Sequence, residues 1–97
     1  MYVSIRRGEV NPGVAAEIAR KVEEGFVPII SQVQGFQAYY MVDLGGNMLA
    51  TVSVFEDKAG AEESNRRAAD WVKQNLVPLM ASPLEIMTGE VVVHREG

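Results

Sequence analysis

A polar and an aromatic side chain on one predicted helix are the first candidates for chemistry. Asn65 falls within the apolar stripe of a helix that should follow Asp57, and Trp71 lies on the flank of that stripe, beside Ser64. A buried amide without hydrogen-bond partners costs about 1–3 kcal/mol. One interpretation is that Asn65 ties the helix to a strand or loop while Trp71 fills the edge of the core. The other places both against a cavity, as hydrogen-bond donor and aromatic wall for a small molecule.

Two adjacent tyrosines are the next candidates. Tyr39 and Tyr40 belong to a predicted strand, so they point to opposite faces of the sheet and at most one of them can face the helices. Either tyrosine could line a pocket. Neither is a good base at neutral pH, because an unperturbed phenol has a pKa near 10.

The other residue types exclude several kinds of site. Cysteine is absent and His94 is the only histidine, which rules out thiolate chemistry and a multi-histidine metal centre within one chain. Glu62 and Glu63 diverge on the predicted helix and do not form an acid–base pair. No Walker loop, GxGxxG, GxSxG or HExxH motif occurs. We therefore expect no metal and no cofactor.

Composition and charge narrow the class of protein. The 97 residues suffice for one domain, residues 1–97, and 47% of them are hydrophobic. The net charge of −4 disfavours nucleic acid as a partner. The N-terminus lacks the apolar region of a secretory signal, and no apolar run is long enough to span a membrane. We expect a cytoplasmic protein.

The elements that position these residues follow the order β-α-β-β-α-β. Strands are predicted over residues 2–7, 36–43, 48–56 and 84–94, and helices over residues 12–33 and 58–79. Asn11 is predicted to cap the first helix and Asp57 the second. The segment 22–30 resembles the segment 72–80, and each contains a proline, Pro28 or Pro78, that should kink or loosen the last turn of its helix. Gly89 is expected to mark a bulge or bend. The order predicts a ferredoxin-like α+β fold with four antiparallel strands and two helices on one face.

The predicted strands also indicate self-association. Neither face of the strands at 36–43 and 48–55 is fully polar, yet two helices can cover only one side of a four-stranded sheet. A second copy of the sheet is the simplest cover for the other side. The sequence therefore predicts a homodimer.

Three segments give the chain a family resemblance: SQVQGFQAYYMV leading into the second strand, SVFEDKAGAEES joining the third strand to the second helix, and AADWVKQNL in that helix. Over nearly its whole length the chain resembles the antibiotic biosynthesis monooxygenase family of dimeric α+β barrels. The resemblance implies a subunit whose sheet packs on its partner's sheet and which holds a pocket between sheet and helices.

The resemblance also implies a range of activities. Some members of the family oxidise quinols or polycyclic aromatic molecules with molecular oxygen and without metal or flavin, whereas others degrade haem. The haem-degrading branch has an asparagine on the first strand and a histidine after its tryptophan. This chain has Ser4 and Arg6 on the first strand, and Ala81 stands at the place of that histidine. In the cofactor-free branch, an asparagine and a tryptophan lie on the pocket side of the helix. Asn65 and Trp71 resemble this pair, although the number of residues between them differs.

Our leading hypothesis is a cofactor-independent monooxygenase-like protein acting on a small aromatic or quinol molecule. Asn65 and Trp71 would be its catalytic residues, and Tyr39, Tyr40 and Ser64 would bind the ligand. The alternative is a non-catalytic small-molecule-binding or stress-related dimeric barrel. An RNA-recognition module has the same strand order, but the acidity of the chain and the lack of aromatic strand motifs argue against it.

Overall fold

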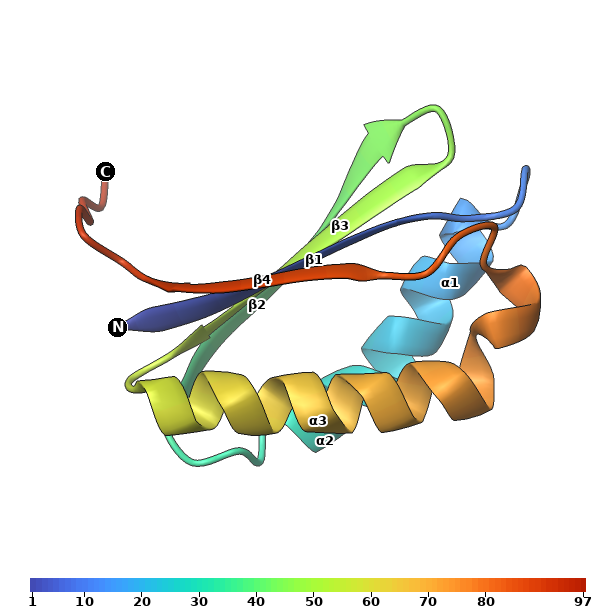
Figure 1. Cartoon of the computed structure of the whole chain (residues 1–97). Helices are drawn as coiled ribbons and strands as arrows, with labels where there is room; N and C mark the ends of the chain where they lie inside the picture. The colour runs from blue at the N-terminus through green and yellow to red at the C-terminus, as the bar shows by residue number, and fades with distance from the viewer.

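The chain folds into a four-stranded antiparallel sheet with helices on one face (Figure 1). The computed structural model describes all of residues 1–97. The elements in order are β1 (Tyr2–Glu9), α1 (Ala15–Lys21), a π-helical turn η1 (Val22–Phe26), α2 (Val27–Ile30), β2 (Phe36–Gly45), β3 (Met48–Phe55), α3 (Lys58–Asn75), a 3-10 turn η2 (Val77–Leu79) and β4 (Glu85–Glu90). The strands lie in the order β2-β3-β1-β4. The predicted ferredoxin-like fold is confirmed.

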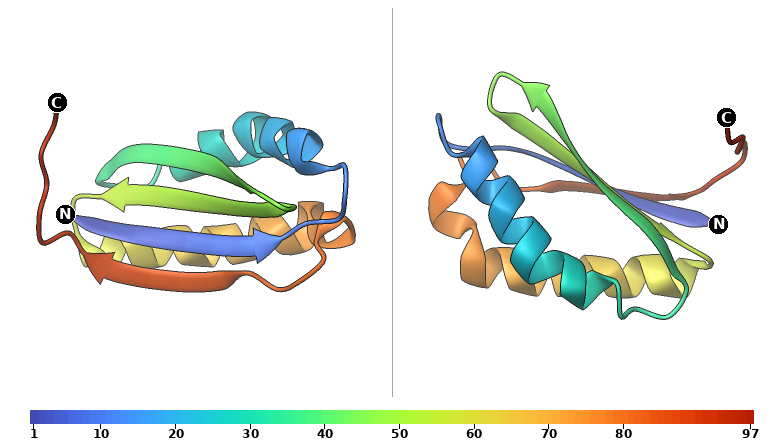
Figure 2. Two further views of the ribbon diagram at one scale, coloured as in Figure 1. Left: turned by 90° about the horizontal axis from the view of Figure 1, so that it is seen from above. Right: turned by 180° about the vertical axis from the view of Figure 1, so that it is seen from behind.

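The helices lie together on one side of the sheet, and its other side carries no element of this chain (Figure 2). Alternation along β1 turns Ser4 and Arg6 toward the helices, and alternation along β3 does the same for Ser53 and Phe55, all four of which are buried. A single cluster of eleven buried hydrophobic residues fills the space between the layers. Three of the four buried polar residues, Ser4, Arg6 and Ser53, therefore belong to the sheet face that meets the helices.

The β2–β3 hairpin has the turn that its glycines predict. Gly45, Gly46 and Asn47 have positive φ angles of 82°, 60° and 64°, a conformation that glycine and asparagine tolerate best. The register irregularities of the sheet lie in β2, between Phe36 and Ala38 and between Asp43 and Gly45. The bulge expected at Gly89 is wrong, because β4 pairs with β1 without a shift in register.

The first helix begins later than predicted. A turn in which the Val14 N–H donates to the Asn11 carbonyl precedes it, Gly13 has a φ of +83°, and the helix starts at Ala15 without a side-chain cap. Asn11 is not the N-cap, because its amide instead donates to the Pro78 carbonyl at 3.0 Å. The amide thus joins the start of one helix to the end of the other.

Both prolines coincide with a change of helix type, as predicted. Ahead of Pro28 the helix widens into the π turn, in which the Val27 N–H donates to the Val22 carbonyl. Pro78 lies within the 3-10 turn that follows α3. A proline supplies no N–H, so the regular α-helical bonding pattern cannot continue through it. The π turn brings Val22 and Phe26 into the core on one side of the helix.

Gly60 is a position where the usual effect of alanine in a helix should reverse. A Cβ there would lie 3.0 Å from the Gln34 carbonyl oxygen and 3.0 Å from the Phe55 ring. Gly→Ala within a helix ordinarily stabilises by up to about 1 kcal/mol, but overpacking costs about 1–3 kcal/mol. We expect Gly60→Ala to lower the free energy of unfolding in urea, with Asp70→Ala on the exposed side of α3 as a control that changes it by less than about 0.5 kcal/mol. A more stable Gly60→Ala protein would contradict this packing.

Candidate functional site

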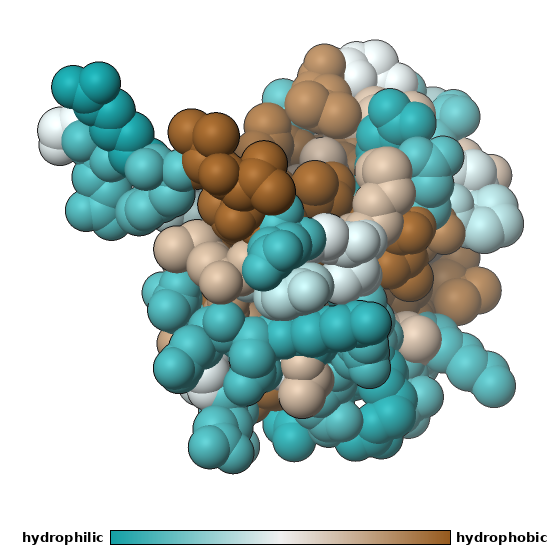
Figure 3. All heavy atoms as spheres, turned by 60° about the vertical axis from the view of Figure 1, so that its left-hand side comes forward, coloured by the Kyte–Doolittle hydropathy of each residue, from teal (hydrophilic) through white to brown (hydrophobic).

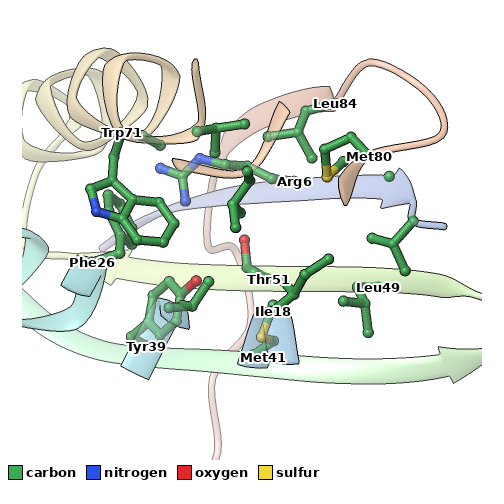
Figure 4. A pocket seen from close by; sticks show the side chains of 16 residues that line it. Arg6, Ile18, Phe26, Tyr39, Met41, Leu49, Thr51, Trp71, Met80 and Leu84 are labelled. Carbon is green, nitrogen blue, oxygen red and sulfur yellow. The ribbon is translucent and has the colours of Figure 1, made fainter. Parts of the chain in front are cut away.

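A mostly apolar cavity lies between the sheet and the helices (Figure 4). Sixteen residues line it, thirteen of them hydrophobic, and they come from strands and helices on all its sides. Its free volume of about 50 Å³ is much smaller than the roughly 300–1,000 Å³ of pockets that hold drug-sized ligands. An aromatic ring would therefore require lining side chains to shift, and Met80 and Leu84, which close the cavity beside Gly8, are flexible enough to do so.

Three aromatic side chains form one wall of the cavity. The Phe26 ring lies between the other two, with its centroid 5.6 Å from that of Trp71 and 5.9 Å from that of Tyr39. Gly25 allows the indole to pack against η1, because a Cβ at this position would lie 3.0 Å from Trp71 Cζ2. The wall offers aromatic faces and edges to a flat ligand.

A guanidinium group enters the cavity from β1. Arg6 is only 3% exposed, and its two terminal nitrogens donate to serine hydroxyls, Nη1 to Ser53 Oγ at 3.0 Å and Nη2 to Ser64 Oγ at 2.9 Å. Ser64 in turn donates to the Ala61 carbonyl at 2.7 Å, which fixes its hydroxyl. Arg6 is thus held by neutral acceptors on β3 and α3.

Two polar atoms in the cavity lining have no hydrogen-bond partner. These are Arg6 Nε and Thr51 Oγ1, both fully buried. Arg6 and Thr51 are directly opposite each other in the β1–β3 register, and both side chains point to the helical side (Figure 4). Unpaired buried polar atoms are rare in folded proteins. They mark the polar end of an otherwise apolar cavity.

Burial also sets the protonation of the titratable groups in the cavity. It lowers the pKa of Arg6 to about 10, and Tyr39 acts slightly in the opposite direction. Burial raises the pKa of the Tyr39 phenol, and the Thr51 hydroxyl and Arg6 guanidinium partly oppose this change; the Thr51 hydroxyl lies near the phenol but outside hydrogen-bond geometry. At neutral pH the site therefore presents a charged guanidinium and a neutral phenol, both of which are donors.

Asn65 ties its helix to the sheet, as the first of the two interpretations of this residue predicts. Its Oδ1 accepts a hydrogen bond from the Ser4 hydroxyl, and its Nδ2 donates to Thr88 Oγ1 at 2.8 Å. The amide thus joins α3 to β1 and β4, and Asn65 is not among the residues that line the cavity. Asn65 and Trp71 are therefore not brought together at one ligand surface.

The other predicted site residues divide between the two faces of the sheet. Tyr39 lines the cavity, whereas Tyr40 lies on the opposite face and is 58% exposed. Ser64 is fully buried and reaches the cavity only through its bond to Arg6. Sequence reasoning missed Arg6, although alternation along the first strand groups it with Tyr2, Ser4 and Gly8 on one face, which the structure shows to be the helical face.

A second hollow adjoins the cavity. It has a volume of about 530 Å³, lies between the first helix and β2, and is lined by ten residues. Four of these also line the cavity: Val22, Tyr39, Met41 and Leu49. These four side chains form a wall between the cavity and a hollow that is large enough for a ring system.

Neither a metal cluster nor a membrane span is present in the structure. No three His, Asp or Glu side chains gather in an arrangement that could hold a metal ion. None of the helices has both the length and the apolar character that crossing a membrane requires.

Solved structures with the same fold align with nearly the whole chain. A protein of unknown function from Nitrosomonas europaea, NE2512, has a TM-score of 0.81 at 22% identity, covering 99% of this chain and 93% of its own. The monooxygenase ActVA-Orf6 of Streptomyces coelicolor, solved with the ligand nanaomycin D, has a TM-score of 0.79 at 14% identity, covering 99% and 91%. A candidate antibiotic biosynthesis monooxygenase from Nitrosomonas europaea has a TM-score of 0.75 at 12% identity, covering 96% and 100%.

Comparisons that use the sequence alone find no match. No protein-family model matches it, and no curated protein matches it either. At these identities the structural likeness establishes the fold, which is the fold that the family resemblance implies.

The contacts of Asn65 predict a loss of stability on its removal. Asn65→Ala should lower the free energy of unfolding by about 1–3 kcal/mol, because the hydroxyls of Ser4 and Thr88 lose their partner. Asn75→Ala is the matched control on the same helix, since its exposed amide donates only to the Trp71 carbonyl, and it should change stability by less than about 0.5 kcal/mol. Equal effects of the two substitutions in urea unfolding would show that the Asn65 bridge contributes nothing.

Proposed function

We propose that this chain is a cofactor-independent monooxygenase-like protein of the antibiotic biosynthesis monooxygenase family, acting on a small aromatic or quinol molecule. The observation that carries the proposal is the cavity between sheet and helices, apolar except for Arg6, Tyr39 and Thr51 and walled by three aromatic rings. The shared fold with a monooxygenase solved in complex with nanaomycin D supports it.

In this reaction the substrate itself is the reductant. Oxidation of a ring CH₂ to C=O by O₂ places one oxygen atom in the product and releases the other as water, and the substrate supplies all four electrons and both hydrogens. The protein then has to orient the substrate, exclude water and stabilise an anionic intermediate through fixed donors. Trp71 and Phe26 would hold the ring, and Arg6 and Tyr39 would face the developing oxyanion.

The alternative is a non-catalytic protein that binds the same class of molecule. One observation favours it: Arg6 and Tyr39 are the only titratable residues that line the cavity, and neither is a base at neutral pH. Such a site could bind a ring without promoting its oxidation. Oxygen uptake distinguishes the two functions.

The monooxygenase proposal predicts oxygen uptake with anthrone-like or quinol substrates. Uptake above the uncatalysed rate should persist in the presence of a chelator, and it should fall more in Trp71→Ala than in Trp71→Phe, because the smaller ring still provides an aromatic wall. Tyr40→Phe, on the opposite face, is the matched control and should leave the rate unchanged. Binding without uptake would favour the alternative function.

We also propose that the outer face of the sheet is covered by a second copy of this chain. Apolar side chains make up the middle of this face, and they include Val3, Ile5, Ala38, Val42, Ala50, Val52, Val54 and Met87, whereas the charged Arg7, Glu9 and Glu85 lie toward one end of β1 and β4. Hydrophobic residues gather on the upper, sheet side of the molecule in Figure 3, whereas the helical side below is mostly hydrophilic. A patch of this kind is typical of an interface.

The dimer proposal predicts twice the subunit mass in light scattering at micromolar concentration. Val52→Lys places a charge at the centre of the outer face and should give a folded monomer, because an unpaired charge in an interface is costly. Asp70→Lys changes the charge on the exposed side of α3 and should remain a dimer. A wild-type monomer, or a Val52→Lys dimer, would refute the sheet-to-sheet arrangement.

A further inference from the structure

Arg6 carries a positive charge for which the chain supplies no counter-charge. The other basic side chains near acids form ion pairs, among them Arg7 with Glu85 and both Arg66 and Arg67 with Glu63, but Arg6 takes part in none. No acidic residue lines the cavity. Arg6 is also the only charged residue among the buried ones.

This arrangement is unfavourable for folding alone. Removing a charge from water costs several kcal/mol unless an opposite charge and hydrogen bonds compensate. Two serine hydroxyls satisfy the ends of the guanidinium, but as neutral acceptors they leave its charge uncompensated. An apolar side chain of similar length would fill the same space, so the guanidinium needs another reason to be there.

The unpaired atoms show where a missing partner would lie. The serines use Nη1 and Nη2, which leaves the Nε–H free, and Thr51 Oγ1 lies in the facing register position on β3. Both atoms belong to residues that line the cavity, and the Tyr39 phenol, a further donor, lies in the same lining. A ligand oxygen at this polar end would therefore have donors from β1, β2 and β3 around it, with its ring against the aromatic wall, once the lining side chains shift to admit it.

We infer that the cavity binds a phenol or quinol as its monoanion, with the anionic oxygen accepting from Arg6 Nε–H and from the hydroxyl of Thr51. The inference rests on the proposed function and adds to it the ionisation state of the ligand that binds in the cavity. A neutral ether or ketone of the same shape would leave the Arg6 charge uncompensated and should bind more weakly. The proton that the ligand loses passes to the solvent.

The charge state bears directly on oxidation. A phenolate or quinol monoanion gives up an electron more readily than the neutral molecule, so a site that favours the anion also favours its reaction with oxygen. Arg6 would act here by lowering the pKa of the ligand, in the same way that an arginine lowers the pKa of a neighbouring acid. The aromatic wall would contribute affinity that does not depend on charge.

Spectrophotometric titration of 4-nitrophenol tests the inference, because only its anion is yellow and it ionises near neutral pH. In wild-type protein at saturating concentration, the pKa of the bound probe should lie below that of the free probe by about one, which corresponds to a tenfold preference for the anion. Arg6→Met and Arg6→Gln should abolish the decrease. Arg7→Met, which removes an exposed arginine from the opposite face of the same strand, should retain it.

Melting curves show which variants are folded. If a variant does not fold, the titration of the wild-type protein still shows whether the cavity prefers the anion of the probe. A bound probe whose pKa is unchanged or raised, the absence of binding at millimolar concentration, or an equal loss in Arg7→Met would overturn the inference. Because the probe needs no oxygen chemistry, a lowered pKa without oxygen uptake would leave the inference standing and reject the monooxygenase. Oxygen uptake without a preference for the anion would reject the inference and leave the monooxygenase proposal standing.

Discussion

The guanidinium of Arg6, buried between sheet and helices without a carboxylate, is the constraint on which the site depends. Its burial requires an acceptor on each side, and Ser53 on β3 and Ser64 on α3 supply them. Both serines are small and fully buried, which keeps the helix close to the sheet. The same geometry leaves Nε without a partner in the cavity lining, so one side chain both joins the layers and gives an apolar space its polar end.

The remaining polar contacts keep this arrangement in place. Asn65 holds α3 to β1 and β4 one helical position after Ser64, and Asn11 joins the segments that precede α1 and follow α3. The π turn before Pro28 sets Phe26 between Trp71 and Tyr39. The cavity therefore lies on the helical face of the sheet, and the outer face, which no element of the chain covers, is the face that we propose for association.

Local patterns predicted the fold well because each depends on a few neighbouring residues. Alternation identified the strands, glycines identified the hairpin turn, and the prolines marked the changes in helix type. The site was harder to predict, because its contacts join residues far apart: Arg6 meets Ser53 and Ser64, and Asn65 meets Ser4. A buried amide in a helix and a charge in a strand indicate that partners are needed, but the sequence does not say which residues they are.

If the cavity binds an anionic oxygen, Arg6 is kept chiefly for the ligand, and its bonds to Ser53 and Ser64 add little net stability to the fold. The most direct test is the free energy of unfolding of Arg6→Met in ligand-free protein, measured in urea. If Arg6 is an uncompensated buried charge, the variant should be as stable as the wild type within about 1 kcal/mol, because removing the charge from the interior offsets the hydrogen bonds that the Ser53 and Ser64 hydroxyls lose. A loss of about 3 kcal/mol or more would show that Arg6 serves the fold and would contradict this account.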